Sequence, residues 1–264
     1  MMAAKKSARR PAVAGATAGF GAAAAAAAVL ALVALPASAA ERTVPTFDAH
    51  YVVEYKGHKV GKMDMSVHYD EKRQRYRFVS RTQASGVLKV VRPKATVQTT
   101  DFVLHDGEIR PLEFWLDDGT RKGEDDRHIV FDWDHGTAIV TRDDRMSELP
   151  LEPDMLDGGT ILVALMLDLE RAVAPGPYKY TDGDAPSSYE YTPTGTEKLD
   201  VEAGTFEAAV IKQHHEGSSR HTVFWAVPKL RFLPAKIAQY KNDELLTAMT
   251  LDSVEGLEPK AAPH

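Results

Sequence analysis

The sequence predicts a mainly β protein: a strongly curled antiparallel sheet of about a dozen strands, half-barrel or sandwich-like, with one packed amphipathic α-helix. Three observations lead to this fold class. Apolar and polar residues alternate with a period of two along most of the chain. Turns that contain Asp or Gly recur between the alternating segments. Only one segment, residues 154–171, has the apolar spacing of a helix.

The alternation defines the expected strands in chain order. In FDAHYVVEYK, Phe47, Tyr51 and Val53 fall on one face of a strand, and the polar residues fall on the other. Asp106-Gly107 predicts a hairpin turn in the middle of the chain. Pro228 predicts a tight turn, and Pro234 predicts a bulge or an edge at the start of the returning strand. Further strands are expected in MDMSVHY, RYRFVSRT, TTDFVLH, EIRPLEFWL, RHIVFDW, TAIVT, PYKYTD, SSYEYTP, TEKLDVEA, FEAAVIKQHH, SRHTVFWAVP, FLPAKIAQYK and ELLTAMTLD.

The single helix is expected between Asp154 and Arg171. Asp154 or Asp157 can cap its start, and Pro175-Gly176 follows its end. Gly158-Gly159 weakens the first turn, so the firm part is expected to begin near Thr160. We expect the helix to pack against the concave face of the sheet. Its apolar stripe comprises Met155, Leu156, Ile161, Leu162, Leu165, Met166 and Leu169.

The first forty residues have the composition of a secretory signal. Basic residues, among them Arg9-Arg10, precede a long apolar run that ends in PASAA, a small-residue cleavage site before Ala40 or Glu41. An uncleaved membrane anchor and a twin-arginine signal are the alternatives. The expected organisation is a signal peptide over residues 1–40, a single β-rich domain over residues 41–256, and a flexible tail over residues 257–264. The mature protein is therefore expected to be periplasmic or secreted, with no stable membrane span.

Composition excludes several kinds of chemistry and partner. The chain has no cysteine, which excludes thiol nucleophiles, thiolate metal sites and disulfides. Its formal net charge is −6, and four basic but no acidic side chains precede residue 41, so the mature part carries a net charge of −10. This acidic balance argues against nucleic acid or anionic lipid head groups as main partners.

Several spaced blocks resemble one bacterial family. They are FDAHYVVEYKGHKVGKMDMSV, RPLEFWLDDGTRKGEDDRHIVFDW, TPTGTEKLDVEAGTFEAAVIK and HTVFWAVPKLRFLPAKIAQY. Together they are similar to the family called domain of unknown function 3108, from about Phe47 to Leu251. The resemblance implies an exported, β-rich protein of the cell envelope. It implies no activity and no catalytic residues, and its rolled sheet is similar in outline to periplasmic carriers of lipids and lipoproteins.

Two polar clusters are candidates for metal binding. His214, His215 and His221 lie close together in KQHHEGSSRH, but His214 and His215 face opposite ways on a strand, so a polar hairpin end is the favoured interpretation. The loop DDGTRKGEDD holds Asp117, Asp118, Glu124, Asp125 and Asp126, which suit calcium but lack the spacing of an EF-hand, so a solvated hairpin tip is favoured. We therefore expect no metal and no cofactor.

Four aromatic residues are the speculative ligand-binding set: Trp115, Trp133, Phe224 and Trp225. Phe224 and Trp225 are neighbours on a strand that is apolar on both faces. Such a strand is either covered by a second protein layer, which we favour, or borders a ligand groove. The sequence contains no G-x-S-x-G or dinucleotide-binding motif. The favoured function is a non-catalytic envelope protein that binds a hydrophobic or amphipathic, lipid-like ligand. The alternatives are an envelope hydrolase and a scaffold that binds another envelope protein through a sheet edge.

Overall fold

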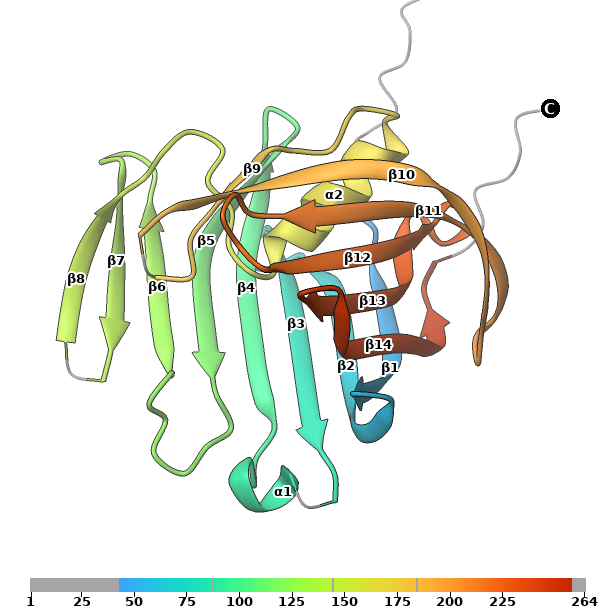
Figure 1. Cartoon of the computed structure of the whole chain (residues 1–264). Helices are drawn as coiled ribbons and strands as arrows, with labels where there is room; N and C mark the ends of the chain where they lie inside the picture. Colours follow the sequence, from blue (N-terminus) through green and yellow to red (C-terminus); the bar gives the residue numbers. More distant parts are fainter. Residues whose placement is uncertain (1–42, 87, 144, 184, 258–264) are drawn as a thin grey trace, which may run out of the picture. The chain divides into compact units, whose positions relative to one another are not determined.

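The fold was analysed in a computed structural model that describes residues 43–86, 88–143, 145–183 and 185–257 of the 264-residue chain. Fourteen strands form one sheet, and every pairing between neighbouring strands is antiparallel (Figure 1). The predicted fold class, a mainly β protein with a curled antiparallel sheet, is confirmed. The predicted signal peptide, residues 1–40, lies outside the described residues.

Most strands are joined by short hairpin turns. The first eight are β1 (Phe47–Tyr55), β2 (His58–Asp70), β3 (Arg75–Ala84), β4 (Thr96–His105), β5 (Glu108–Asp117), β6 (Arg127–Asp132), β7 (Thr137–Arg142) and β8 (Arg145–Pro150). The others are β9 (Tyr178–Tyr180), β10 (Ser187–Val201), β11 (Gly204–His214), β12 (Arg220–Val227), β13 (Leu233–Lys241) and β14 (Glu244–Glu255). The helices are α1 (Leu88–Val91), which lies between β3 and β4, α2 (Thr160–Glu170), which lies between β8 and β9, and the 3₁₀ turn η1 (Pro228–Leu230).

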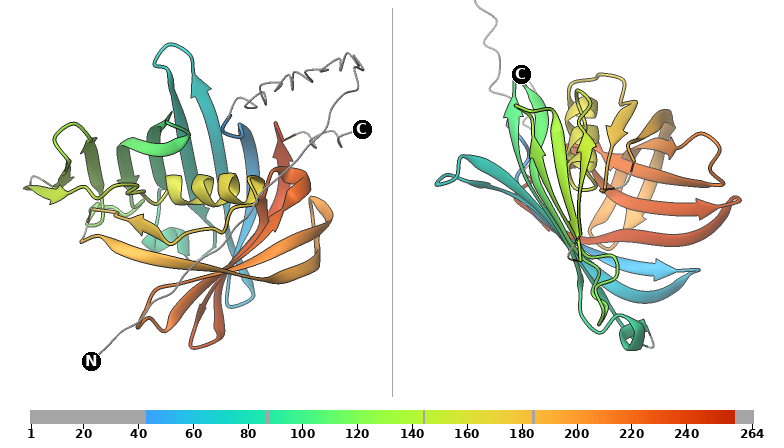
Figure 2. Two further views of the ribbon diagram at one scale, coloured as in Figure 1. Left: turned by 90° about the horizontal axis from the view of Figure 1, so that it is seen from above. Right: turned by 90° about the vertical axis from the view of Figure 1, so that its left-hand side faces the viewer.

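One pairing joins the two halves of the sheet. Strands β1 to β8 form one meander and strands β9 to β14 form another, and β1 pairs with β14. Strands β8 and β9 are therefore the two edges, and the sheet is not closed. Figure 1 shows β10–β12 on one side of α2 and β3–β5 on the other. In Figure 2 the two arms of the sheet diverge, with the helix between them.

The alternation in β1 produces the core as predicted. Phe47, Ala49 and Tyr51 are each 1% exposed, whereas His50 between them is exposed. The buried face of β1 continues into β2 through Met65 and forms one large apolar cluster with residues of α2. A smaller cluster lies under β5, β6 and β7, formed by Phe114, Ile129, Phe131, Ala138 and Val140.

Helix α2 packs into the concave side of the sheet, as predicted, and begins at Thr160. The buried apolar residues are Leu162, Val163, Leu165, Met166 and Leu167. They extend further round the helix than the predicted stripe, because the two arms of the sheet cover α2 from two sides. The predicted stripe residues Ile161 and Leu169 are only half-buried.

Asp157 is the residue that caps α2. Its Oδ1 accepts hydrogen bonds from the backbone nitrogens of Gly159 (2.8 Å) and Thr160 (2.9 Å), and from Thr100 Oγ1 on β4 (3.0 Å). A side chain at Gly159 would place its Cβ 2.6 Å from the ring of Phe78, so this position needs glycine. The two glycines that weaken the helix start in the sequence thus permit close packing on β3 and β4.

The two prolines have the structural roles predicted for them. Pro228 begins η1, which connects β12 to β13. Pro234 pairs with Ala226 next to a register shift between Trp225 and Ala226, and its carbonyl accepts a hydrogen bond from Tyr51 Oη (2.9 Å). A proline in an interior strand is tolerated here because the bulge interrupts the ladder of hydrogen bonds.

The structure adds three findings to what the sequence predicted. The short helix α1 forms between β3 and β4, where only a turn was expected. Leu257, the first residue of the predicted tail, is 8% exposed and belongs to the main apolar cluster, and residues 258–264 lie outside the described part of the chain. Within the described ranges, no helix has the length and apolar character needed to cross a membrane.

Candidate functional site

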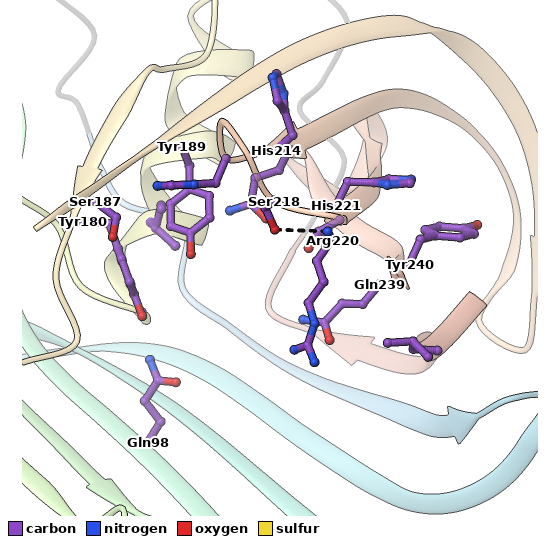
Figure 3. A pocket seen from close by; sticks show the side chains of 16 residues that line it. Gln98, Tyr180, Ser187, Tyr189, His214, Ser218, Arg220, His221, Gln239 and Tyr240 are labelled. Atoms are coloured by element: carbon purple, nitrogen blue, oxygen red, sulfur yellow. Dashed lines mark hydrogen bonds between the residues drawn. The ribbon is translucent and has the colours of Figure 1, made fainter. Parts of the chain in front are cut away.

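A pocket of about 650 Å³ opens between the two arms of the sheet, beside the start of α2. Its volume lies within the range typical of small-molecule sites, roughly 300–1,000 Å³. Gly158 and Ile161 from the helix end border it, and strands β4 and β9 to β14 supply the rest of the wall (Figure 3). The polar and aromatic side chains important below are Gln98, Tyr180, Tyr189, Gln213, Arg220 and Gln239.

Strand register explains why polar residues face this pocket. Gln213, Thr222 and Gln239 lie directly opposite one another on β11, β12 and β13. Each lies two positions from a member of the row Ile211, Phe224 and Ile237, so both rows share the core face of the sheet. The core face therefore changes from apolar to polar at this end of the three strands.

Gln98 closes the pocket from the opposite arm. It lies on β4, two residues from the buried Thr100 that bonds Asp157, so its side chain shares the helix-facing side of β4. The Gln98 Nε2 atom is buried and has no hydrogen-bond partner. Figure 3 shows Gln98 across the pocket from Arg220 and Gln239.

The pocket is unusual in its charge. None of its sixteen lining residues is an Asp or a Glu, although acidic residues outnumber basic ones in the whole chain. Arg220 contributes the one permanent positive charge among those lining residues. Its guanidinium forms no ion pair with any residue that the structure describes. The arrangement favours a polar ligand with negative character over a cationic one.

The three histidines do not converge on one point. His214 and His221 lie directly opposite each other, and the next residue in this row is Tyr240, whose ring stacks on His221 with centroids 4.9 Å apart. His215 faces the other way and contacts the ring edge of Tyr189. His214 lies near Glu190 and His215 near the neighbouring Tyr189, so the two side chains diverge, yet all three histidines line the pocket beside α2. Burial and the charge of Lys212 lower the pKa of His221.

The acidic loop differs from the solvated tip that the sequence predicts. Asp118 is only 3% exposed, and its carboxylate accepts bonds from the backbone nitrogens of Thr120 (2.7 Å) and Asp125 (3.2 Å). Burial opposes ionisation, but these hydrogen bonds outweigh it and lower the pKa of Asp118. Carboxylate atoms of Asp117, Asp118 and Asp126 lie within 4.8 Å of one another. Because Asp126 also accepts a bond from the Asp118 backbone nitrogen, these carboxylates hold the loop in its folded form.

The four aromatic residues of the speculative ligand-binding set are not brought together. Trp115 stacks on His128 (5.1 Å between centroids), and Trp133 donates from Nε1 to the Pro111 carbonyl (2.7 Å). None of the four lines the pocket beside α2. Their role in binding stays a prediction.

Trp225 is covered on its own face of the strand. It is 8% exposed, donates from Nε1 to Glu197 Oε2 (2.8 Å), and has Lys236 Nζ 4.7 Å from its ring centroid. Phe224 faces the opposite side and approaches Tyr191 (6.2 Å between centroids). These contacts describe a strand packed on both sides, which is the interpretation that the sequence analysis favoured.

Sequence reasoning missed the pocket residues. Gln98, Gln213 and Gln239 belong to strands far apart in the sequence, and no motif links them. One signal was present for Gln239, a polar residue at an inward position of a strand whose other inward residues, Leu233, Ala235 and Ile237, are apolar. A search for polar residues on the predicted apolar faces would have found it.

An open, curled antiparallel sheet with a helix between its arms and a polar pocket beside that helix defines a β-barrel-like protein with an internal site. The profile of the family described as "Protein of unknown function (DUF3108)" matches residues 46–243, so the chain belongs to this family. Among curated proteins, none matches the chain.

Solved structures support the fold. The beta-barrel-like protein of domain of unknown function DUF1849 from Brucella abortus is 12% identical, with a TM-score of 0.50 over 80% of this chain and 98% of its own. A candidate exported protein with a YmcC-like fold from Bacteroides fragilis is 12% identical, with a TM-score of 0.34 over 80% of this chain and 96% of its own. A candidate lipoprotein from Parabacteroides distasonis is 11% identical, with a TM-score of 0.35 over 81% and 96%. The first shares the fold, and the other two are too distant to carry an argument.

Proposed function

We propose that this protein is an exported, non-catalytic binding protein of the cell envelope, whose pocket holds a hydroxyl-rich amphipathic ligand such as an oligosaccharide. The observation that carries the proposal is the 650 Å³ pocket with a polar and aromatic wall on the otherwise apolar core face. Polar groups on a pocket wall contribute little to the free energy of folding. They lose hydration when the chain folds, and they do not fill the space between the arms with packed side chains. It is therefore best explained by a ligand.

The lining favours a sugar-like molecule over a hydrocarbon chain. The amides of Gln98, Gln213 and Gln239 each offer donors and an acceptor, and the rings of Tyr180 and Tyr189 offer apolar faces. Ile161 and Leu246 are the only aliphatic side chains among the lining residues. A saccharide presents hydroxyl groups at its edge and C–H groups on its ring faces, which matches this wall. The ligand that we propose therefore belongs to the polar end of the amphipathic range expected from the sequence.

The chemistry of the lining supports binding without catalysis. Glycoside hydrolysis ordinarily requires two carboxyl groups at the reacting bond, and the described residues that line this pocket include none. Acyl transfer by a serine requires a hydrogen bond from a general base. Ser187 and Ser218 line the pocket, but neither hydroxyl is bonded to a histidine in the described structure.

The structure gives less support to the alternative that this protein is a scaffold for another envelope protein. Strand β8 is a free edge, which another chain could extend. However, its six residues include Arg145, Glu148 and Pro150, residue types that protect edges against such pairing. Export is supported by the basic, apolar and small-residue regions of residues 1–40.

A pocket-filling variant tests the proposal. In the ¹⁵N-labelled protein recovered from the cell envelope, we expect maltotriose, chitotriose or trigalacturonic acid trimethyl ester to shift the side-chain amide signals of Gln98 and Gln239. Thr222→Trp should abolish these shifts by filling the pocket, while the melting temperature stays close to that of the wild type. Ser147→Trp, on the exposed strand β8, is the control and should bind normally.

Three outcomes would contradict the proposal. If no trisaccharide shifts a pocket signal, or if the shifts persist in folded Thr222→Trp, the pocket is not a saccharide site. Release of shorter saccharides during the titration would contradict the non-catalytic part.

A further inference from the structure

We infer that Arg220 and Gln98 form a subsite for an oxyanion in the pocket, either a carboxylate or a phosphate group. That this oxyanion belongs to a saccharide rests on the function proposed above. The ligand is then an acidic saccharide, and these two side chains bind its anionic group. Three independent observations converge on this subsite.

The first observation is the unpaired state of Arg220. Two arginines that lie partly buried in the fold are neutralised by carboxylates: Arg77 makes two hydrogen bonds to Asp101, and Arg231 makes two to Glu170. Arg220, by contrast, is exposed at the pocket. Arg220 has no such partner among the described residues, and in Figure 3 its guanidinium points toward Gln98 and Gln239. A planar guanidinium binds carboxylate or phosphate through two parallel hydrogen bonds, so it is suited to supply the charge of this subsite.

The turn before β12 fixes the position of Arg220. The Arg220 backbone nitrogen donates to Ser218 Oγ (3.1 Å), and the Ser218 backbone nitrogen donates to the His215 carbonyl (3.1 Å). The backbone at the start of the strand is therefore set by the turn itself. Only the side chain of Arg220 has to adjust when a ligand enters.

The second observation is the unsatisfied donor on the opposite wall. Gln98 Nε2 is buried without an acceptor, which is costly in a folded protein. Gly158 makes room for this amide, since a Cβ there would lie 2.8 Å from Gln98 Nε2. Because Gln98 lines the pocket, a rotation of its amide toward the cavity would let a ligand oxygen supply the missing acceptor.

The third observation is the absence of acidic side chains among the described residues that line the pocket. No carboxylate belongs to the sixteen lining residues, in a chain with 38 acidic and 32 basic side chains. A pocket that excludes acidic residues while the chain as a whole is acidic is matched to an anion, because nearby carboxylates would repel it. The same lining offers a cation no anionic partner.

Matched probes separate the anion subsite from the saccharide site. The wild-type protein is titrated with trigalacturonic acid, with its trimethyl ester, which has the same skeleton without the charge, and with inorganic phosphate. The readouts are the Arg220 Nε–H signal and the Gln98 side-chain amide signals in ¹⁵N spectra. We expect the acid to bind about 10- to 100-fold more tightly than the ester, the range of a hydrogen-bonded charged group.

Variants assign that preference to Arg220. Arg220→Gln should remove the preference for the acid and leave the affinity for the ester unchanged, and Arg220→Lys should restore only part of it. Arg81→Gln, an exposed arginine on β3 outside the pocket, is the matched control and should bind both probes like the wild type. Melting temperatures confirm that each variant is folded.

The outcomes separate the two proposals. Equal binding of acid and ester to the wild type, or an acid preference that survives in Arg220→Gln, overturns the oxyanion subsite but leaves the saccharide pocket in place. If phosphate shifts the Arg220 signal while none of the trisaccharides binds, maltotriose and chitotriose included, the subsite stands and the saccharide function fails. If phosphate and every trisaccharide leave both signals unshifted, both proposals are overturned.

Discussion

The space between the arms of the sheet contains two different regions. Around α2 it is filled: Leu165 and Met166 are 1% and 0% exposed and belong to the main apolar cluster. Beside the start of the same helix it is open, and the inward residues become Gln98, Gln213 and Gln239. The apolar region supplies stability through burial, roughly 25 cal/mol for each Å² removed from water. The polar region contributes little of this kind, so its residues are free to be selected for a ligand.

The largest effect is expected in the filled region. Leu165→Asp places a carboxylate among apolar side chains, where it has no partner. Truncation of such a leucine alone costs about 2–5 kcal/mol, and the unpaired charge adds to this, so we expect the domain to unfold or nearly so. Urea denaturation followed by circular dichroism measures the loss.

The control for this substitution is Leu88→Asp in α1. Leu88 is 41% exposed, so the same change should alter the unfolding free energy by less than about 0.5 kcal/mol. A wild-type denaturation midpoint for Leu165→Asp would show that α2 is not part of the core, and the contrast between the two regions would disappear.

The next effect concerns the aromatic residues. Trp225→Ala removes a ring that is 8% exposed and bonded to Glu197, so it should cost about 3–5 kcal/mol. Trp115 is only half-buried, so Trp115→Ala should cost distinctly less. Thermal unfolding of both variants tests the order. If Trp225→Ala is as stable as the wild type but no longer shows the saccharide-induced shifts of the side-chain amide signals, Trp225 has the ligand-binding role predicted from the sequence and not a packing role.

A smaller effect should appear at the boundary between the two regions. Burial raises the pKa of Asp157 from 3.8 to about 6, against the opposing hydrogen bonds from Thr160 and Gly159. A carboxyl group whose pKa is raised by folding stabilises the fold fully below its unfolded pKa, and this stabilisation is lost as the pH rises through the folded pKa. Between about pH 4 and pH 6 this group should cost the fold on the order of 3 kcal/mol.

Asp157→Asn isolates this contribution. The amide oxygen can keep the bonds of Oδ1, and the amide nitrogen replaces Oδ2, which has no partner. The variant should gain stability relative to the wild type as the pH rises from about 4 to 7, as measured by urea denaturation at several pH values. Asp157→Ala, which lacks both the titrating group and the cap, should be less stable than Asp157→Asn at every pH by about 0.5–2 kcal/mol or more. Parallel pH profiles for Asp157→Asn and the wild type would refute the raised pKa.

Local patterns made much of the fold predictable. The buried row Phe47, Tyr51 and Val53 follows from alternation alone, because successive side chains on a strand point to opposite faces. The start of α2 near Thr160 was predictable for a similar reason, since the capping residue and the glycines lie next to it. The same reasoning failed at Asp118, where neighbouring charges predict solvent exposure but backbone donors of the loop bury the carboxylate.

The candidate site was not predictable in this way. Strand pairing brings Gln213, Thr222 and Gln239 into one row, and the curl of the sheet brings Gln98 across from them. The aromatic residues that the sequence singled out are conspicuous by type, yet the structure separates them. Residue type alone therefore pointed to packing positions, and the pocket residues are ordinary polar residues at unusual positions.

The sequence by itself determined most of the strands and hairpin turns and the position of the helix, because these depend on neighbours within a few residues. It did not predict β8, and it predicted two strands where the structure has the single strand β10. Only the tertiary structure decided that β1 pairs with β14, that the arms enclose α2, and that a polar pocket remains beside its start. These features depend on contacts between residues far apart in the chain. The geometry of the curled sheet sets those contacts, and no local pattern encodes it.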